Sequence, residues 1–182
     1  MTSPTADVSC RVAWADDAPA IARLQLRTRQ HDLGGMLPAD RLEAEPSVAE
    51  EAWRRVLGRP PDARIRVLVA LERNRVVGFA ITSPASDPDT NPVADAELME
   101  LTVDPDERGR GHGSRLLQAA VDTMVADRFS RAVCWAVTSD DDVRRFLTEA
   151  GWGSDGAHRE LDLDGTGAVT AKQVRLHTQF TE

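Results

Sequence analysis

Residues 97–127 read ELMELTVDPDERGRGHGSRLLQAAVDTMVAD, and this stretch decides the fold. Its first seven residues, 97–103, predict a β-strand, and the helical spacing of apolar residues predicts an amphipathic helix over 111–127. The next apolar run, AVCWAV at 132–137, predicts another strand. A strand–helix–strand crossover implies a parallel strand pair, because the helix carries the chain back to the same end of the sheet.

The turn inside this stretch, VDPDERGRGHGS at 103–114, has the composition of a phosphate site. Glycines let backbone N–H groups approach a ligand, and the start of the following helix offers unpaired N–H donors and a positive dipole. Together these features favour an anion such as phosphate. Arg108 and Arg110 add two cations. The alternative interpretation is a glycine-rich connector with solvated arginines.

Two common nucleotide motifs are excluded here. A Walker A loop requires Gly-Lys-Ser/Thr, and this turn has no lysine. A dinucleotide fingerprint requires G-x-G-x-x-G in the first strand–helix unit. This chain instead has G-x-G-x-G, and several predicted strands precede it.

The remaining pattern predicts an α+β fold with a mixed sheet, in the order β-α-α-β-β-β-α-β-α-β-β. A helix is expected after Asp17 and ends before a break at 31–38. A second helix is expected to begin at Ser47, through a capping box with Glu50. The other predicted strands are 10–14, 64–71, 76–82, 160–163 and 173–180, and the last helix is 141–150. A flexible terminus at 1–7 and one domain at 8–182 follow, since no long linker appears.

Composition narrows the class of protein. The chain has 182 residues and a formal net charge of −8, which disfavours nucleic-acid binding. No apolar run is long enough to span a membrane and no signal-peptide pattern appears, so we expect no membrane partner. Cys10 and Cys134 form no paired motif, which favours a reduced, cytoplasmic protein. The four histidines lack metal-site spacing, so no metal is expected.

At this point the turn resembles a known family. Arg108-Gly109-Arg110-Gly111-His112-Gly113 resembles the Q/R-x-x-G-x-G/A signature of the GCN5-related N-acetyltransferase (GNAT) superfamily. RRFLTEAGW at 144–152 resembles a later segment of that family, and the element order agrees over nearly the whole chain. GGMLP at 34–38, the helix with Trp53 and GWGSDG at 151–156 resemble a bacterial, small-molecule-type branch.

The resemblance implies the acyl-CoA N-acyltransferase fold and transfer of an acetyl group from acetyl-CoA to a primary amine of a small molecule. It implies backbone contacts from 101–103 to the pantetheine arm and from 108–114 to the pyrophosphate. His112 is expected to be exposed and non-catalytic. Asp140 matches a cofactor-contacting asparagine, although we favour a helix cap there. A homodimer remains open. The implied cofactor-binding residues are Leu101, Thr102, Val103, Arg108, Gly109, Arg110, Gly111, His112, Gly113, Ser114 and Asp140.

Two carboxylates on the strand are candidates for the general base. Glu97 lies on the strand face of Met99, whereas Glu100 lies on the face of Thr102. A carboxylate among apolar neighbours has a raised pKa, which suits removal of a proton from an ammonium. Glu97 ranks slightly ahead, and a strand bulge would favour Glu100. For either one, the alternative is a solvent-exposed strand carboxylate.

One departure from the family bears on catalysis. Many members protonate the departing thiolate with a tyrosine, but this chain contains none, and Leu147 stands at the matching position. That position is expected at a hydrated site mouth, and the alternative is that Leu147 is a packing residue of the core. A CoA thiol has a pKa of about 8.5, so it can leave unprotonated near neutral pH. The alternative function is a non-catalytic acyl-CoA-binding or sensor module that has lost the catalytic tyrosine.

Overall fold

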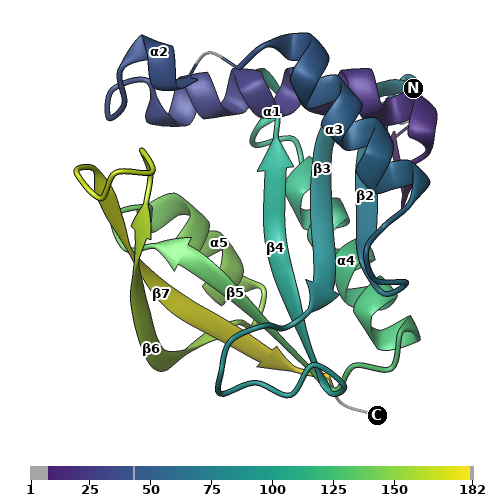
Figure 1. Ribbon diagram of the computed structural model, residues 1–182. Helices are drawn as coiled ribbons and strands as arrows, with labels where there is room; N and C mark the ends of the chain where they lie inside the picture. The colour runs from purple at the N-terminus through teal and green to yellow at the C-terminus, as the bar shows by residue number, and fades with distance from the viewer. Residues whose placement is uncertain (1–7, 43, 181–182) are drawn as a thin grey trace, which may run out of the picture. The chain divides into compact units, whose positions relative to one another are not determined.

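The computed structural model describes residues 8–42 and 44–180 and has the predicted element order (Figure 1). The sequence pattern did not indicate the short helix α2 or the two 3-10 helices, Ala15–Asp17 and Pro105–Glu107. The helices are α1 (Ala18–Leu33), α2 (Ala39–Leu42), α3 (Pro46–Gly58), α4 (His112–Ala126) and α5 (Asp141–Glu149). The strands are β1 (Val8–Val12), β2 (Arg66–Glu72), β3 (Arg75–Pro84), β4 (Asp95–Val103), β5 (Arg131–Val137), β6 (Gly153–Asp162) and β7 (Thr170–Gln179).

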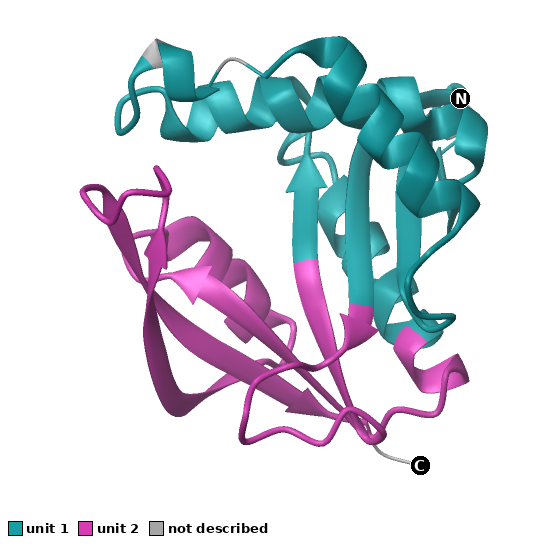
Figure 2. Cartoon of the chain, viewed as in Figure 1, with its two compact units in different colours: residues 1–82, 100–123 teal, residues 83–99, 124–182 magenta. Residues whose placement is uncertain are grey.

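The chain forms two compact units, which Figure 2 colours separately. The first unit comprises residues 1–82 and 100–123, and the second comprises 83–99 and 124–182. Strand β4 therefore begins in the second unit and ends in the first. The single domain expected over 8–182 stays a prediction, and the terminus expected at 1–7 lies outside the described residues.

The strands follow the order β1-β2-β3-β4-β5-β7-β6. Strands β4 and β5 are parallel, as the crossover through α4 requires, while β2–β3 and β5–β7 are antiparallel. The β2–β3 hairpin turns at Arg73 and Asn74, whose φ angles are 49° and 64°. Two successive left-handed residues match the right-handed twist of the flanking strands. The mixed α+β sheet is thereby confirmed.

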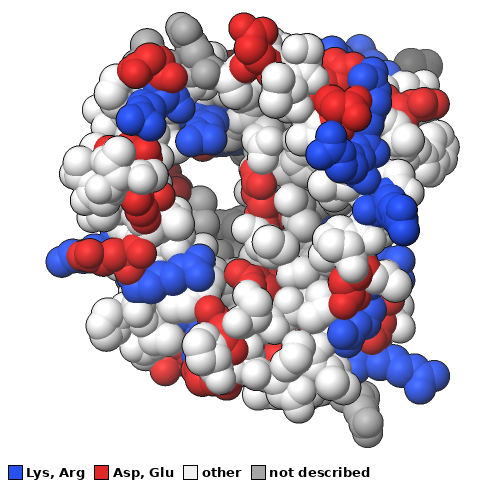
Figure 3. All heavy atoms as spheres, in the orientation of Figure 1, with Lys and Arg blue, Asp and Glu red and all other residues white. Residues whose placement is uncertain are grey.

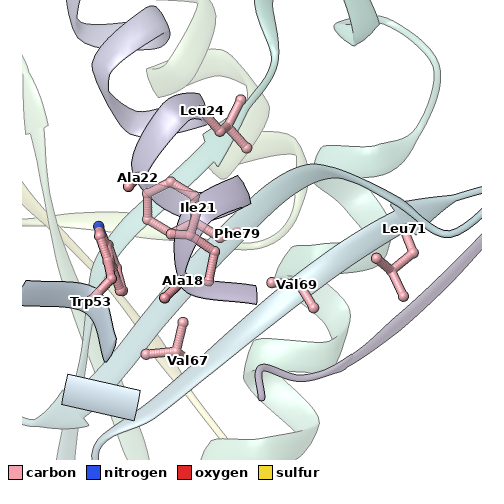
Figure 4. Packing of buried hydrophobic residues seen from close by; sticks show 9 residues of the cluster. All are labelled: Ala18, Ile21, Ala22, Leu24, Trp53, Val67, Val69, Leu71 and Phe79. Atoms are coloured by element: carbon pink, nitrogen blue, oxygen red, sulfur yellow. The ribbon is translucent and has the colours of Figure 1, made fainter. Parts of the chain in front are cut away.

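The core of the first unit lies between β2, β3 and two helices (Figure 4). Val67, Val69 and Leu71 alternate along β2 and face Ile21 of α1, because alternate side chains of a strand point to the same face. The rings of Trp53 and Phe79 meet edge to face with centroids 5.3 Å apart. Helix α4 packs on the other side, where Leu116 approaches Gly78. The apolar patterning thus fixes both faces of this part of the sheet.

The second unit buries one sheet face and leaves the other polar. Helix α5 packs against β5, and the buried apolar residues of this unit include Ala132, Cys134, Ala136, Leu147, Trp152 and Leu176, together with Val133 on the opposite face of β5. Register places Glu97 opposite Val133 and Trp135 opposite Arg175, so these four residues share the opposite face. That polar face carries the candidate functional residues that surround Glu97.

Several boundaries differ from the sequence prediction, and three of the differences have a clear physical reason. Helix α3 begins at Pro46 rather than Ser47, because proline lacks an N–H and suits the first helical position. Helix α1 continues through Leu33, since no helix-breaking residue precedes Gly34. Strand β6 begins at Gly153, far earlier than 160, because its residues are held by hydrogen bonds to β7 and lack an apolar alternation.

Candidate active site

The glycine-rich turn joins the end of β4 to the start of α4. Gly109 and Gly111 have φ angles of 76° and 83°, a region that residues with a Cβ rarely adopt. Gly113 and the exposed Ser114 lie in the first turn of α4, where backbone N–H groups have no partner within the helix. The geometry therefore agrees with a strand–turn–helix anion site in the first unit.

The two arginines of this turn are already paired with carboxylates. Arg108 donates two hydrogen bonds to Asp32 of α1, at 3.1 and 2.9 Å. Arg110 donates to Glu107 at 2.5 Å. Such alternation of charge recurs on the surface, where basic and acidic atoms lie side by side on the face drawn in Figure 3. An incoming phosphate would therefore compete with Asp32 and Glu107 for these guanidinium groups.

His112 is buried, with a relative exposure of 2%, so its expected exposure is wrong. It is the first residue of α4 and lies one turn before the fully buried Leu116, on the inner face of the helix. Its Nε2 lies 3.3 Å from Oε2 of Glu72. Its side chain therefore packs under the turn, and only its backbone is available to contact a ligand.

Glu72, Glu107 and His112 form a group of possible metal ligands, with donor atoms within 4.8 Å of one another. Glu107, however, accepts hydrogen bonds from Arg75 and Arg110. Two guanidinium cations at one of the three ligands oppose a metal cation by charge repulsion. The expectation that no metal is bound stays a prediction.

The residues expected to contact the pantetheine arm, Leu101, Thr102 and Val103, end strand β4. Neighbouring Gly78 of β3 allows close approach here, because a Cβ on it would lie 2.8 Å from the carbonyl oxygen of Thr102. The carbonyl of Val103 accepts a hydrogen bond from Nε of Arg108 at 3.3 Å. Cofactor contacts at these three positions remain predictions.

Glu100 lies in the first unit among neutral hydrogen-bond donors. Its two oxygens accept from Oγ1 of Thr102 at 3.0 Å and from Nε2 of Gln25 at 3.3 Å. Gln25 in turn accepts from Nε1 of Trp53 at 3.0 Å, which fixes its amide. Burial raises the pKa of Glu100, and the two hydrogen bonds offset only part of that rise.

Glu97 lies in the second unit among charged groups. Burial raises the pKa of its carboxyl, and the negative charge of Asp87 adds to the rise. The guanidinium groups of Arg159 and Arg175 act in the opposite direction. Both candidate bases thus have the raised pKa that the sequence analysis expected, and Glu97 owes part of its shift to neighbouring charges.

Arg175 of β7 organises the charges around Glu97. Its side chain is 5% exposed and meets three carboxylates. Its Nη1 lies 3.1 Å from Asp87 and 2.7 Å from Asp89, and its Nε lies 2.8 Å from Asp155. Because Asp87 and Asp89 belong to the β3–β4 loop, Arg175 ties that loop to the sheet of the second unit.

Sequence analysis missed several residues of the site, and Arg175 of the predicted last strand was one of them. Gln25 looked like an ordinary helix residue, and Arg159 lay in a segment without a strand pattern. Trp135 was counted only as part of an apolar strand. The indole of Trp135 within a run of small residues was the one sequence signal for this group. Its partners on β6 and β7 gave no signal, because strand pairing decides which of their side chains lie beside it.

Two positions near α5 also differ in role from the family. Asp140 caps the helix, since its Oδ1 accepts from the backbone N–H of Val143 at 3.0 Å, as favoured. Leu147 is 4% exposed and packs in the core, so the expectation of a hydrated site mouth there is wrong. Cys134 is no ready acid either, because burial raises its pKa to about 12.

Comparison with known proteins agrees with what the turn and the sheet indicate. The model of the acetyltransferase (GNAT) family matches residues 24–152, which is more than half of the chain. The chain belongs to the acetyltransferase (GNAT) family. The predicted superfamily is thereby confirmed.

A curated relative is the mycothiol acetyltransferase of Nocardiopsis dassonvillei, 38% identical over 73 residues. The matched stretch covers 40% of this chain and 20% of that protein. This GNAT chain therefore shares a short segment with it.

Solved structures of acetyltransferases share the fold over nearly the whole chain. The PaiA N-acetyltransferase of Thermoplasma acidophilum, in complex with coenzyme A, matches with a TM-score of 0.70 and 13% identity, over 96% of this chain and 99% of that one. The ribosomal-protein-alanine N-acetyltransferase of Brucella melitensis matches with a TM-score of 0.73 and 17% identity, over 94% and 99%. The YncA protein of Salmonella typhimurium, with acetyl-CoA, matches with a TM-score of 0.70 and 19% identity, over 96% and 95%.

These likenesses confirm the acyltransferase fold of the GNAT chain. In the described part of the chain, every helix is too short or too polar to cross a membrane.

Proposed function

We propose that the protein transfers the acetyl group of acetyl-CoA directly to the primary amine of a small molecule. The observation that carries the proposal is the turn at 108–114, with two left-handed glycines before the start of a long helix. Backbone N–H groups in this arrangement suit the CoA pyrophosphate. The PaiA structure, a likeness in fold, contains coenzyme A, which supports the choice of ligand.

The reaction requires an amine without its extra proton. In the proposed step, Glu97 accepts a proton from the ammonium group, and Glu100 is the alternative base. The freed nitrogen lone pair forms the C–N bond to the acetyl carbon, and the C–S bond breaks with its electron pair leaving on sulfur. The nitrogen then loses its second proton to water, which gives the neutral amide. The thiolate can depart without a side-chain acid, because a thiol of this kind has a pKa of about 8.5.

A property shared by the two candidate bases supports this chemistry over a non-catalytic module. Both carboxylates of β4 have raised pKa values, which brings each nearer to the pH at which a general base works best. Proton removal by either carboxylate does not require a tyrosine. The small-molecule nature of the acceptor belongs to this proposal. The cytoplasmic location and the homodimer also stay predictions.

The turn is tested by Gly111→Asp, with Gly165→Asp as the matched control. Both glycines have positive φ angles, 83° and 75°, and Gly165 lies in the β6–β7 turn. Both variants therefore add one negative charge at a residue with a positive φ angle, although a Cβ on Gly111 would also lie 3.3 Å from Nη1 of Arg115. We expect Gly111→Asp to lower CoA affinity at least ~100-fold, because a carboxylate would face the phosphates, and Gly165→Asp to bind CoA normally.

Titration calorimetry with CoA provides this measurement, and circular dichroism checks that both variants are folded. Release of thiol from acetyl-CoA across a panel of amines then tests transfer itself. Equal CoA affinity in both folded variants would overturn the assignment of the turn. Tight CoA binding with no thiol release for any amine would favour the non-catalytic module.

A further inference from the structure

The polar face of the second unit holds an arginine whose contacts are incomplete. Arg159 extends from β6, and its guanidinium carbon lies 4.2 Å from the centre of the Trp135 ring. Its Nε donates to Oε1 of Gln173 at 2.8 Å. The ring and the amide together hold the guanidinium plane in one orientation.

The outer edge of this guanidinium group is available. Among the described residues, neither Nη atom of Arg159 donates a hydrogen bond, and Nη1 lies 4.0 Å from the nearest carboxylate oxygen, on Asp87. The side chain is 41% exposed. A planar fork with two free donors matches the two oxygens of a carboxylate or phosphate.

Arg175 shows what a saturated arginine looks like in the same place. It lies against the same Trp135 ring, at 5.6 Å, but its nitrogens are taken by Asp87, Asp89 and Asp155. Asp87 is therefore already balanced by Arg175 and by the indole N–H, which donates to it at 3.1 Å. This leaves the charge of Arg159 available for a ligand.

Strand register places Arg159 on the same sheet face as Glu97. Arg159 pairs with Gln173 of β7, Trp135 pairs with Arg175, and Glu97 pairs with Val133 of β5. Paired residues point to the same face. The charge of Arg159 acts on the Glu97 carboxyl, so the two groups lie within electrostatic range.

We propose that Arg159 binds an acidic group of the acceptor, so that the acceptor is an amine that also carries a carboxylate or phosphonate. The inference rests on the proposed function and adds its substrate class. The ammonium group would face Glu97, and the oxyanion would lie on the free edge of Arg159, over Trp135. One face thus offers opposite charges to the two ends of a zwitterion.

The test uses matched acceptors and matched variants of the full chain. The panel holds α-, β- and γ-amino acids, the alkylamine that lacks each carboxylate, and the aminophosphonic acid that replaces it. The variants are Arg159→Gln and Arg159→Lys. Lys172→Gln is the control, because it also removes one positive charge from the β6–β7 strand pair. Lys172 is exposed and adjacent to Gln173 in the strand, so its side chain points to the sheet face opposite that of Arg159.

We expect the wild type to prefer an acidic member of the panel over its alkylamine. Arg159→Gln should lower kcat/KM for that acceptor about 10–100-fold, mostly through KM, as loss of hydrogen bonds to a charged group does. Its kcat/KM with the alkylamine should fall by a much smaller factor, because that acceptor has no oxyanion for Arg159 to bind. Arg159→Lys should recover part of the activity, since lysine retains the charge but not the fork. The carboxylate and phosphonate arms show which oxyanion fits.

Equal use of an amino acid and its alkylamine by the wild type would overturn the proposal. An equal loss for both acceptors in Arg159→Gln would do the same. If no amine is acetylated, the proposed function fails, and calorimetry with the same acids in the presence of CoA decides the subsite separately. Binding that Arg159→Gln abolishes would uphold it, and absence of binding to the wild type would overturn it.

Discussion

Glu97 and Glu100 lie three residues apart on β4, yet their surroundings differ in kind. Glu100 in the first unit has neutral partners, Thr102 and Gln25. Glu97 in the second unit lies among the charges of Asp87, Arg159 and Arg175. Burial raises both pKa values, but only that of Glu97 also depends on neighbouring ions. The same residue type in one strand can therefore be tuned by hydrogen bonding or by charge.

The largest expected effect separates the two carboxylates as bases. Glu97→Gln should lower kcat by ~10²–10⁴, since general base catalysis contributes about that much, whereas Glu100→Gln should keep kcat within about tenfold. Steady-state rates at saturating acetyl-CoA and amine measure this, with CoA affinity as the control for folding and binding. The reverse result would make Glu100 the base, and near-normal rates in both variants would assign proton removal to water or the substrate.

The next effect concerns the ion networks of the two regions. Arg175→Met should destabilise the protein by about 3–5 kcal/mol, because it leaves the largely buried carboxylates of Asp87 and Asp155 without their cation. Arg110→Met in the first unit should cost at most about 1 kcal/mol, because that side chain is 60% exposed. Urea denaturation measures both. Equal losses would show that the charge network of the second unit is no more important to folding than a surface pair.

A smaller effect lies in the pH dependence of the rate. Arg159 lowers the pKa of Glu97, so Arg159→Gln should move the acid limb of kcat to higher pH if Glu97 is the base. Gln25→Leu should leave that limb in place, since Gln25 acts on Glu100. Rate profiles from acid to neutral pH measure the shift. A limb that moves with Gln25→Leu instead would identify Glu100 as the titrating group.

The smallest effect is on stability. A carboxyl whose pKa is raised by folding stabilises the protein below its ordinary pKa, and this contribution is lost as pH rises through the raised value. Ionised Glu97 and Glu100 are therefore a cost at neutral pH. Gln at either position should raise Tm at pH 7 by on the order of 2–4 °C, as about 1 kcal/mol does in a chain of this size.

Thermal melts of the two Gln variants at pH 7 and pH 4 measure that contribution. The gain should shrink toward pH 4, where the wild-type carboxyls are neutral. A gain that is the same at both pH values would mean that ionisation of these groups does not oppose folding.

Local patterns were enough for the first unit's main features. Alternation over 97–103, the apolar face of 111–127 and three closely spaced glycines predicted the strand, the helix and the phosphate turn. Each depends on residues a few positions apart, where backbone geometry acts directly. His112 was the exception, since its burial depends on which face of α4 meets β2, and a polar side chain there gives no apolar signal.

The charged face of the second unit was decided by tertiary structure. Sequence alone determined the order of elements, the α+β class, the turn and two candidate carboxylates, because these follow from short-range periodicity and backbone chemistry. It did not bring Asp87, Trp135, Arg159 and Arg175 together, although they span the chain from the β3–β4 loop to β7. Their meeting depends on which strands pair and in what register, and a shift of one residue would turn every side chain to the other face.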